Sequence, residues 1–187
     1  RDLQKLGMRS SVTSELVLEE CFVPEENRVG EEGAGFVMAL RTVEWDRSTL
    51  LAPFLGQLQF LVDRCCGYAS ERVQFGRPIA SFQAVKHKIA NLKILLEAAR
   101  TLVYRVAWCK DQGRPLNPME AACAKLFVGD ASLGPTNDAV VLHGGYGYCH
   151  ESDVERVFRD ARLAAIGGGT SDIQKLVISR LMEGEEA

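Results

Sequence analysis

The sequence predicts an all-α protein, an up-down four-helix bundle preceded by a short β segment. From residue 33 onward, apolar side chains recur at spacings of three and four, the period of a helix with one buried face. Before residue 33, apolar and polar residues alternate instead, which is the period of a strand. Hydrophobic residues make up 47% and charged residues 25% of the chain, so a folded domain is expected rather than a disordered segment.

The β segment lies at the beginning of the chain. Apolar and polar residues alternate from Val12 to Leu18, so residues 11–23 are predicted to form a strand that ends at Pro24. A single strand or hairpin is not stable alone in water, so this segment needs a sheet that the sequence does not visibly contain. The chain begins with Arg1 rather than Met, and we expect that residue 1 is not the native start.

The remaining elements are predicted to be helices. They lie at about residues 36–43, 46–72, 81–110, 118–142, 152–159 and 170–183. Asp46 or Ser48 is expected near the start of the second helix, and Pro53 is expected in its early turn or at a kink. Ser81 is expected to cap the third helix, and Pro135 to kink the fourth.

Charge and composition argue against several classes of protein. The chain has 22 basic and 25 acidic residues and a net charge of -3, so nothing suggests binding to nucleic acid or to an anionic membrane. No apolar run approaches the ~18 residues of a membrane-spanning helix. The six cysteines form no CxxC pair and there are three histidines, so no metal site and no secreted disulfide framework is predicted. Reduced thiols in an intracellular protein fit best.

Three segments carry side chains suited to chemistry, and each also has a simpler structural explanation. The run from Glu44 to Arg47 holds two carboxylates, an indole and a guanidinium, but a helix-capping carboxylate would explain it as well. Arg72 begins a turn after a helix, where a cation suits the helix dipole. The glycine pair after His143 and the glycine triplet before Thr170 let a backbone approach a ligand, although turn geometry alone also accounts for them. Neither a dinucleotide-binding GxGxxG nor a phosphate-binding P-loop pattern occurs.

Five fragments of the chain form a recognisable series. They are Leu6-Gly7-Met8-Arg9-Ser10 followed by Val23-Pro24, Gly33-Ala34-Gly35-Phe36, Arg72 to Ile79 with Phe82-Gln83, His143 to Tyr148, and Val154 to Arg162 followed by Ile166 to Ile173. In this order and spacing they resemble the C-terminal part of an acyl-CoA dehydrogenase. The resemblance covers nearly the whole chain.

The resemblance implies how the chain is organised. Residues 1–32 would be the remnant of the family's middle β-domain, and residues 33–187 would be its C-terminal helical bundle domain. The family's flavin ring rests mainly on the β-domain, and an N-terminal domain closes the acyl pocket. We therefore expect the 187-residue chain alone to bind no flavin and to turn over no substrate.

The resemblance also implies an activity. Family members are homotetrameric flavoproteins that introduce an α,β double bond into an acyl thioester. A carboxylate removes the α-proton while the β-hydrogen leaves as hydride to FAD. The implied partners are an acyl-CoA or acyl-carrier-protein thioester, an electron-transferring flavoprotein and further copies of the chain, as a dimer or tetramer. The implied location is the bacterial cytoplasm or the mitochondrial matrix.

The catalytic base is where this sequence departs from the family pattern. Many members place a glutamate directly before Gly-Thr, a position that is Gly168 here. A smaller branch, including the isovaleryl-type enzymes, places the glutamate on the long helix before an arginine, which matches Asp46 and Arg47. Asp46 is therefore the predicted base, although it is one methylene shorter and a misplacement of about 1 Å can cost ~100-fold in rate. Glu44 is a poorer candidate because residues two apart on a helix point to different faces.

Further residues take roles from the resemblance. The predicted substrate-binding residues are Glu44, Arg47, Gly167 and Gly168, and the small glycines are expected to leave room for branched or bulky acyl groups. The predicted cofactor contacts are Arg72 and Phe75, which in the family hold the pyrophosphate and adenosine of a neighbouring subunit's FAD, with Gln83, Gly144, Gly145, Thr170 and Asp172. Asp172 would repel pyrophosphate unless it is turned away or bridged. Val141 replaces a glutamine that the family usually has.

Two alternative functions remain open within this family. One is a catalytically silent subunit that serves the assembly of a heteromeric acyl-CoA dehydrogenase. The other is an acyl-CoA oxidase, which passes electrons to oxygen. A nitroalkane oxidase also uses an aspartate, but at the position of Gly168, which argues against that activity.

Overall fold

The computed structural model describes residues 2–184, except for the side chain of Glu44. Its α-helices are α1 (Gly35–Thr49), α2 (Ala52–Glu71), α3 (Gln83–Asp111), α4 (Pro118–Ala131), α5 (Leu133–His143), α6 (Asp153–Ala161) and α7 (Ser171–Met182). Short 3-10 helices are η1 (Glu25–Asn27), η2 (Ile79–Ser81), η3 (Gly144–Tyr148) and η4 (Arg162–Ala165), and the strands β1 (Val73–Gln74) and β2 (Arg77–Pro78) form one small hairpin. The predicted all-α bundle is confirmed.

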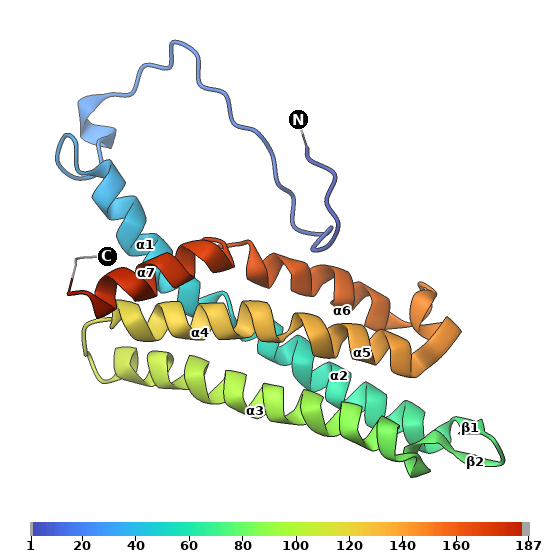
Figure 1. The fold of residues 1–187 in the computed structure, drawn as a ribbon. Coiled ribbons are helices and arrows are strands. Elements are labelled where there is room, and N and C mark those ends of the chain that lie inside the picture. The colour runs from blue at the N-terminus through green and yellow to red at the C-terminus, as the bar shows by residue number, and fades with distance from the viewer. Residues whose placement is uncertain (1, 185–187) are drawn as a thin grey trace.

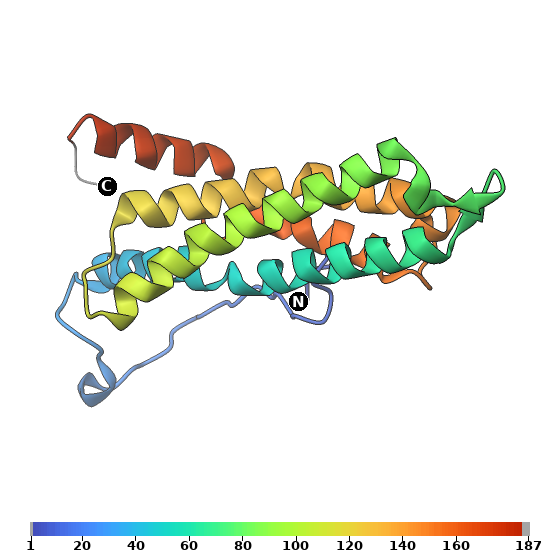
Figure 2. The same cartoon turned by 90° about the horizontal axis from the view of Figure 1, so that it is seen from below.

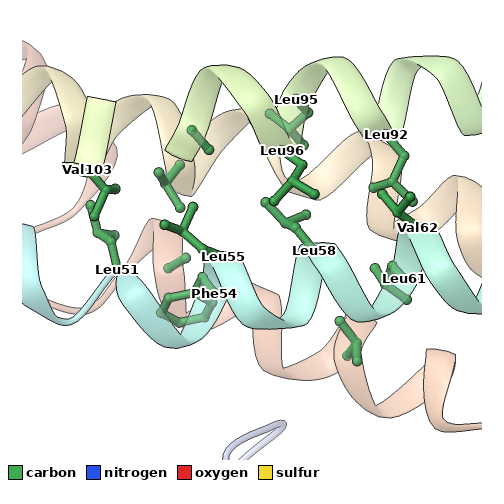
Figure 3. Close-up of a cluster of buried hydrophobic side chains, with 14 of the residues drawn as sticks. Leu51, Phe54, Leu55, Leu58, Leu61, Val62, Leu92, Leu95, Leu96 and Val103 are labelled. Atoms are coloured by element: carbon green, nitrogen blue, oxygen red, sulfur yellow. The ribbon is translucent and has the colours of Figure 1, made fainter. Parts of the chain in front are cut away.

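The helices group into four rods, and each rod runs antiparallel to the one before it in the chain (Figure 1). The first rod is α1 with α2, the second is α3, the third is α4 with α5, and the fourth is α6, η4 and α7. Leucines spaced three and four apart on α2 and α3 interleave between the first two rods (Figure 3). Burying such a side chain fully contributes roughly 1.5–3 kcal/mol, so this seam is a main source of the bundle's stability.

The first rod breaks later along the chain than the sequence predicts: the break expected between residues 43 and 46 lies between Thr49 and Ala52. The expected helix over residues 46–72 is wrong at its start, because Asp46 and Ser48 lie inside the last turn of α1. Neither caps a helix, and the Ser48 hydroxyl donates to the Trp45 carbonyl at 2.8 Å. Pro53 explains the break, since it lacks an N–H and its ring would clash with the carbonyl of Thr49. The prediction that Pro53 lies in an early turn of the long helix is confirmed.

Other helix ends test the capping predictions. Thr170 caps α7, with its hydroxyl oxygen accepting from the Ile173 N–H at 3.4 Å. Ser81 does not cap α3, because it lies in η2 and donates to the Pro78 carbonyl. The third rod breaks at Ser132, just before Pro135, as the predicted kink requires.

The predicted strand over residues 11–23 is wrong in the described chain. One isolated bridge joins Asp2 to Ser14, and the segment beyond it arches away from the bundle (Figure 1). A strand exists only when its backbone groups pair with a neighbour, and among the described residues none pairs with residues 15–23. The division at residue 32 stays a prediction.

The beginning of the chain is nevertheless fastened to the bundle at one loop. The Arg159 guanidinium donates to the Leu6 carbonyl at 3.0 Å, and the Met8 N–H donates to the buried Asp160 carboxylate at 2.5 Å. A Cβ on Gly7 would lie 2.6 Å from the Arg159 carbonyl oxygen. Only glycine permits this approach, so the Leu6-Gly7-Met8 fragment docks on the end of α6.

Two general features of the described chain bear on its class. No helix within residues 2–184 is long and apolar enough to cross a membrane. The cysteines in the same range are all free.

Candidate active site

A pocket of about 130 Å³ lies where the end of α1 and the start of α2 meet α4 and the segment after η4. Leu50, Leu51, Phe54 and Leu163 supply much of its wall. We call it the Asp46 pocket, because the half-buried side chain of Asp46 lines it. Its mostly apolar walls favour an apolar occupant beside a single carboxylate.

The structure brings several predicted site residues together in this pocket. Asp46 and Arg47 come from α1, while Gly167 and Gly168 come from the other end of the chain. The Arg47 Nε donates to the Gly168 carbonyl at 3.1 Å, which joins two residues 121 positions apart. Glu44 lies in α1, and its side chain lies outside the described part of the molecule.

The glycine loop, residues 167–169, has a conformation that favours glycine. Gly168 has φ +70° and Gly169 has φ +98°, in the left-handed region that L side chains rarely adopt. A Cβ on Gly169 would also lie 2.7 Å from the Gln174 Nε2. A Cβ on Gly168 would meet only the Arg47 Cγ, at 3.7 Å, so the pocket has room where many relatives are expected to carry a glutamate.

Two buried polar residues near this loop escaped the sequence reasoning. Lys125 on α4 is 1% exposed and Gln174 on α7 is 0% exposed. Burial lowers the pKa of Lys125, Asp130 acts in the opposite direction, and Arg47 adds to the lowering. The missed signal was helical register, since Lys125 follows Ala121 by four residues on the buried face of α4.

The predicted cofactor residues gather mainly at the far end of α2. Arg72 ends α2 as its C-cap, and its guanidinium lies over the Tyr146 ring at 5.5 Å. Phe75 is 91% exposed at the tip of the hairpin, and Gln83 is exposed at the first position of α3. With Gly144 and Gly145 on η3 they form the hairpin cluster, beside an open cleft of about 520 Å³.

His143 is the last residue of α5 and directly precedes the glycine pair of the hairpin cluster. Its ring stacks on Tyr68 at 4.3 Å, its Nδ1 lies 2.8 Å from the Ala139 carbonyl, and the Tyr68 hydroxyl donates to its carbonyl. Burial lowers the pKa of His143, partly offset by the Ala139 bond. A neutral, fixed imidazole therefore holds the turn at Gly144, where φ is +60°.

The remaining two predicted cofactor residues lie elsewhere. Thr170 and Asp172 stand at the start of α7, beside the glycine loop. The Asp172 side chain is 94% exposed and lies 3.5 Å from the Lys175 Nζ. Its carboxylate is thus turned to solvent and paired with a lysine.

The Asp46 pocket and the hairpin cluster are separated by the whole of α2. Its 20 residues correspond to about 30 Å at ~1.5 Å per residue. One copy of the chain therefore presents two groups of site residues at different places along the bundle (Figures 1 and 2).

The fold and these motifs define a class. Residues 33–183 match the family described as "Acyl-CoA dehydrogenase, C-terminal domain", and the chain belongs to this family. It is 44% identical over 176 residues to a probable acyl-CoA dehydrogenase of Bacillus subtilis, covering 94% of the chain and 46% of that relative.

Solved structures agree with this assignment. The chain superimposes on the butyryl-CoA dehydrogenase of Megasphaera elsdenii with a TM-score of 0.93 at 38% identity, over 98% of the chain and 48% of the other. On the prolyl acyl carrier protein oxidase AnaB the TM-score is 0.92 at 36% identity, over 97% and 48%. The family and the bundle fold inferred from the sequence are confirmed. The chain spans about half the length of the curated relatives it matches.

Proposed function

We propose that this chain is the C-terminal part of an FAD-dependent dehydrogenase that introduces an α,β double bond into an acyl thioester, with Asp46 as the base. One observation carries the proposal. Asp46 lines the same apolar pocket as Gly168, the position that has no side chain to act as a base. A carboxylate from α1 thus lines the same pocket as this vacant position, which supports the proposal. The names of the relatives support acyl thioester dehydrogenation in general.

The chain's own residues account for the proton transfer. Asp46 accepts the α-proton of an acyl group in the Asp46 pocket, whose mostly apolar walls favour an apolar occupant over water. Arg47 bonds to the Gly168 carbonyl and so fixes the opposite part of the wall relative to α1. An acyl chain held between these two walls lies next to the base.

FAD fits the residues of the hairpin cluster. Arg72 supplies a cation for pyrophosphate, and the exposed Phe75 ring supplies a flat surface for a planar group. Gly144 and Gly145 bring backbone without side chains to the same cleft, with Gln83 on the neighbouring helix end. When bound, FAD supplies the hydride acceptor.

The two groups of site residues favour an assembly of several copies. The start of α7, with Thr170, lies beside the Asp46 pocket, whereas Arg72 lies at the other end of α2. A flavin held near Asp46 reaches an Arg72 more readily from a neighbouring copy. We therefore include in the proposal a homo-oligomer, dimer or tetramer, that acts on acyl-CoA or acyl-carrier-protein thioesters and reduces an electron-transferring flavoprotein.

The substitution Asp46→Asn in the flavin-loaded complete protein tests the base. We expect kcat to fall at least ~100-fold, since the amide cannot accept the proton, while the flavin absorbance stays unchanged. Asp111→Asn, at the exposed end of α3, is the matched control and should keep full activity. An unchanged rate in Asp46→Asn removes the assigned base, and an inactive parent protein favours the silent assembly role.

The oxidase alternative has one specific point in its favour. The similarity to a prolyl acyl carrier protein oxidase shows that this bundle also occurs in a protein named as an oxidase. The electron acceptor separates the two activities. Peroxide formation during turnover would identify an oxidase, and reduction of an electron-transferring flavoprotein would identify a dehydrogenase.

The acyl preference forms part of the same proposal. The open space beside Gly168 leaves room for a branch near the reacting carbons. We expect higher kcat/KM for α-branched than for straight-chain thioesters of equal length. A clear preference for straight chains would remove this part.

A further inference from the structure

Two buried polar atoms close to the glycine loop have no hydrogen-bond partner among the described residues. They are the Nζ of Lys125 and the Oε1 of Gln174. The ammonium can only donate and the amide oxygen can only accept, so the two atoms are complementary. A buried polar group without a partner destabilises the fold, and more so when it is charged, so each atom requires an explanation.

Both residues lie near Gly168. Gln174 donates from Nε2 to the Gly168 carbonyl at 3.3 Å. Lys125 lines the Asp46 pocket together with Gly167 and Gly168, and α4 packs directly on α7. The bond to Gly168 also fixes the orientation of the amide, because a carbonyl accepts only from the nitrogen. The Gln174 oxygen is therefore left on the other side, free to accept from a donor.

We propose that Lys125 and Gln174 are positioning residues that hold the glycine loop through one hydrogen-bond chain. The Lys125 ammonium donates to an ordered water, the water donates to the Gln174 Oε1, and the Gln174 Nε2 donates to the Gly168 carbonyl. Lys125 shares a pocket wall with Gly168, and Gln174 is hydrogen-bonded to Gly168, so one water next to this residue meets both polar atoms. The chain satisfies both unpaired atoms with one molecule.

The chain has a consequence for the geometry of the pocket. The Gly168 carbonyl accepts from Gln174 and also from Arg47, the residue after Asp46. The loop is thus held by α7 and α4 on one side and by the helix that carries the base on the other. Loosening the Lys125–Gln174 side shifts the wall that faces the acyl group, and a shift of about 1 Å can cost ~100-fold in kcat.

A double-mutant cycle tests the chain without any assay of activity. In the complete protein, Lys125→Met and Gln174→Met should each lower the folding equilibrium constant at least tenfold, because each leaves its partner buried and unpaired. The double variant should be no less stable than the worse single variant, since both polar ends are then gone. Lys175→Met, an exposed lysine on α7, is the matched control. If the double variant lowers the folding equilibrium constant by the product of the two single effects, the proposal is overturned.

Hydrogen–deuterium exchange tests the position of the loop directly. Amides within residues 163–173 should exchange at least tenfold faster in Lys125→Met and Gln174→Met, but not in Lys175→Met. Lys125→Gln keeps a donor and should restore most of the protection, and it also serves if Lys125→Met does not fold. Exchange that is unchanged in the Met variants, or not restored in Lys125→Gln, contradicts the chain.

The kinetic arm of the test depends on the proposed function. If the protein is a dehydrogenase, Gln174→Met should lower kcat far more than it raises KM, because the loop positions the reacting carbons. Equal changes in kcat and KM, or no change in either, contradict the positioning role. If the parent protein has no activity, the proposed function fails, while the stability cycle and the exchange rates still decide the inference.

Discussion

Two glycines of the third rod differ in what an added methyl group would meet. A Cβ on Gly129 would lie 2.7 Å from the Ala164 carbonyl oxygen, a backbone atom that cannot move aside, whereas nothing lies within 4 Å of a Cβ on Gly134. We expect Gly129→Ala to destabilise the bundle by about 1–3 kcal/mol. Gly134→Ala should stabilise it by about 0.5–1 kcal/mol, because alanine loses less chain entropy in a helix. Urea unfolding measures both, and shifts of the same sign would contradict this account.

The vacant position in the glycine loop can be tested by moving the base. A side chain at Gly168 has space, since its Cβ would meet only Arg47, but φ +70° imposes a strain of about 1–2 kcal/mol. In the complete protein we expect Asp46→Ala to abolish turnover and the pair Asp46→Ala with Gly168→Glu to restore a measurable part. Single-turnover flavin reduction is the measurement. Asp46→Ala with Gly168→Gln is the control, and recovery there would mean that the carboxylate is not what matters.

Single residues show where sequence reasoning reached its limit. Asp46 and Gly168 line one pocket, and their roles as base and vacant position stay predictions from the resemblance. The bond between Arg47 and Gly168 joins residues 121 positions apart, and local pattern says nothing about such a pair. The sequence pattern does not single out Gln174, which is fully buried. Burial of a polar side chain depends on which rod covers it, which is decided by tertiary packing.

At the scale of elements, the hairpin combines strain with exposure. Phe75 has φ +54° and Gly76 has φ +78°. A two-residue type I′ hairpin turn requires positive φ at both central residues. A bulky aromatic residue is poorly suited to that conformation. We expect Phe75→Asn to raise the free energy of unfolding by about 0.5–1 kcal/mol, since Asn-Gly suits the turn. The same change should weaken FAD binding in the complete protein.

Two measurements separate these effects of the hairpin. Thermal unfolding of the flavin-free protein reports the relief of strain, and a fluorescence titration with FAD reports the affinity. Phe75→Ala is the control, because it removes the ring without favouring the turn. An FAD affinity that is unchanged in both variants would remove Phe75 from the cofactor surface.

Helix α6 carries a predictable dependence on pH. The Arg159 guanidinium, hydrogen-bonded to Glu155 at 2.7 Å, lowers the pKa of that carboxyl from 4.5 to about 2, with help from His150. The folded pKa is depressed, so the stabilisation is present above pH 4.5 and is lost as the pH falls from 4.5 towards 2. Glu155→Gln should lower the unfolding midpoint at pH 6 and flatten its decline below pH 4.5. Parallel declines in both proteins would contradict this assignment.

Elements were predictable where local chemistry decides them. Thr170 caps α7 and Pro53 breaks the first rod, because an N-cap hydroxyl and a missing N–H act within a few residues. The hairpin at Phe75-Gly76 was not predicted, since its two-residue strands are too short to show alternation. The prediction of a strand over residues 11–23 was wrong although its alternating pattern is clear. A strand also needs a neighbouring strand to pair with, and the pattern of one segment does not supply that neighbour.

The whole molecule presents its site residues in two places, the Asp46 pocket and the hairpin cluster. Asp46 precedes α2 and Arg72 ends it, so about 30 Å of helix stands between them. A flavin site that uses both residues takes them from different copies of the chain. Each copy then contributes a base to one site and a cation to another.

Subunit complementation tests that arrangement. In the complete protein, Asp46→Asn alone should remove the base, and Arg72→Glu alone should prevent FAD binding. When the two variants are co-expressed, a mixed pair contains one site with both defects and one site with neither. Random pairing then restores about a quarter of the wild-type sites. Flavin content and turnover of the purified mixture measure this fraction. If both residues served one site from the same copy, no intact site would form, so an inactive mixture of verified hetero-oligomers would exclude sharing.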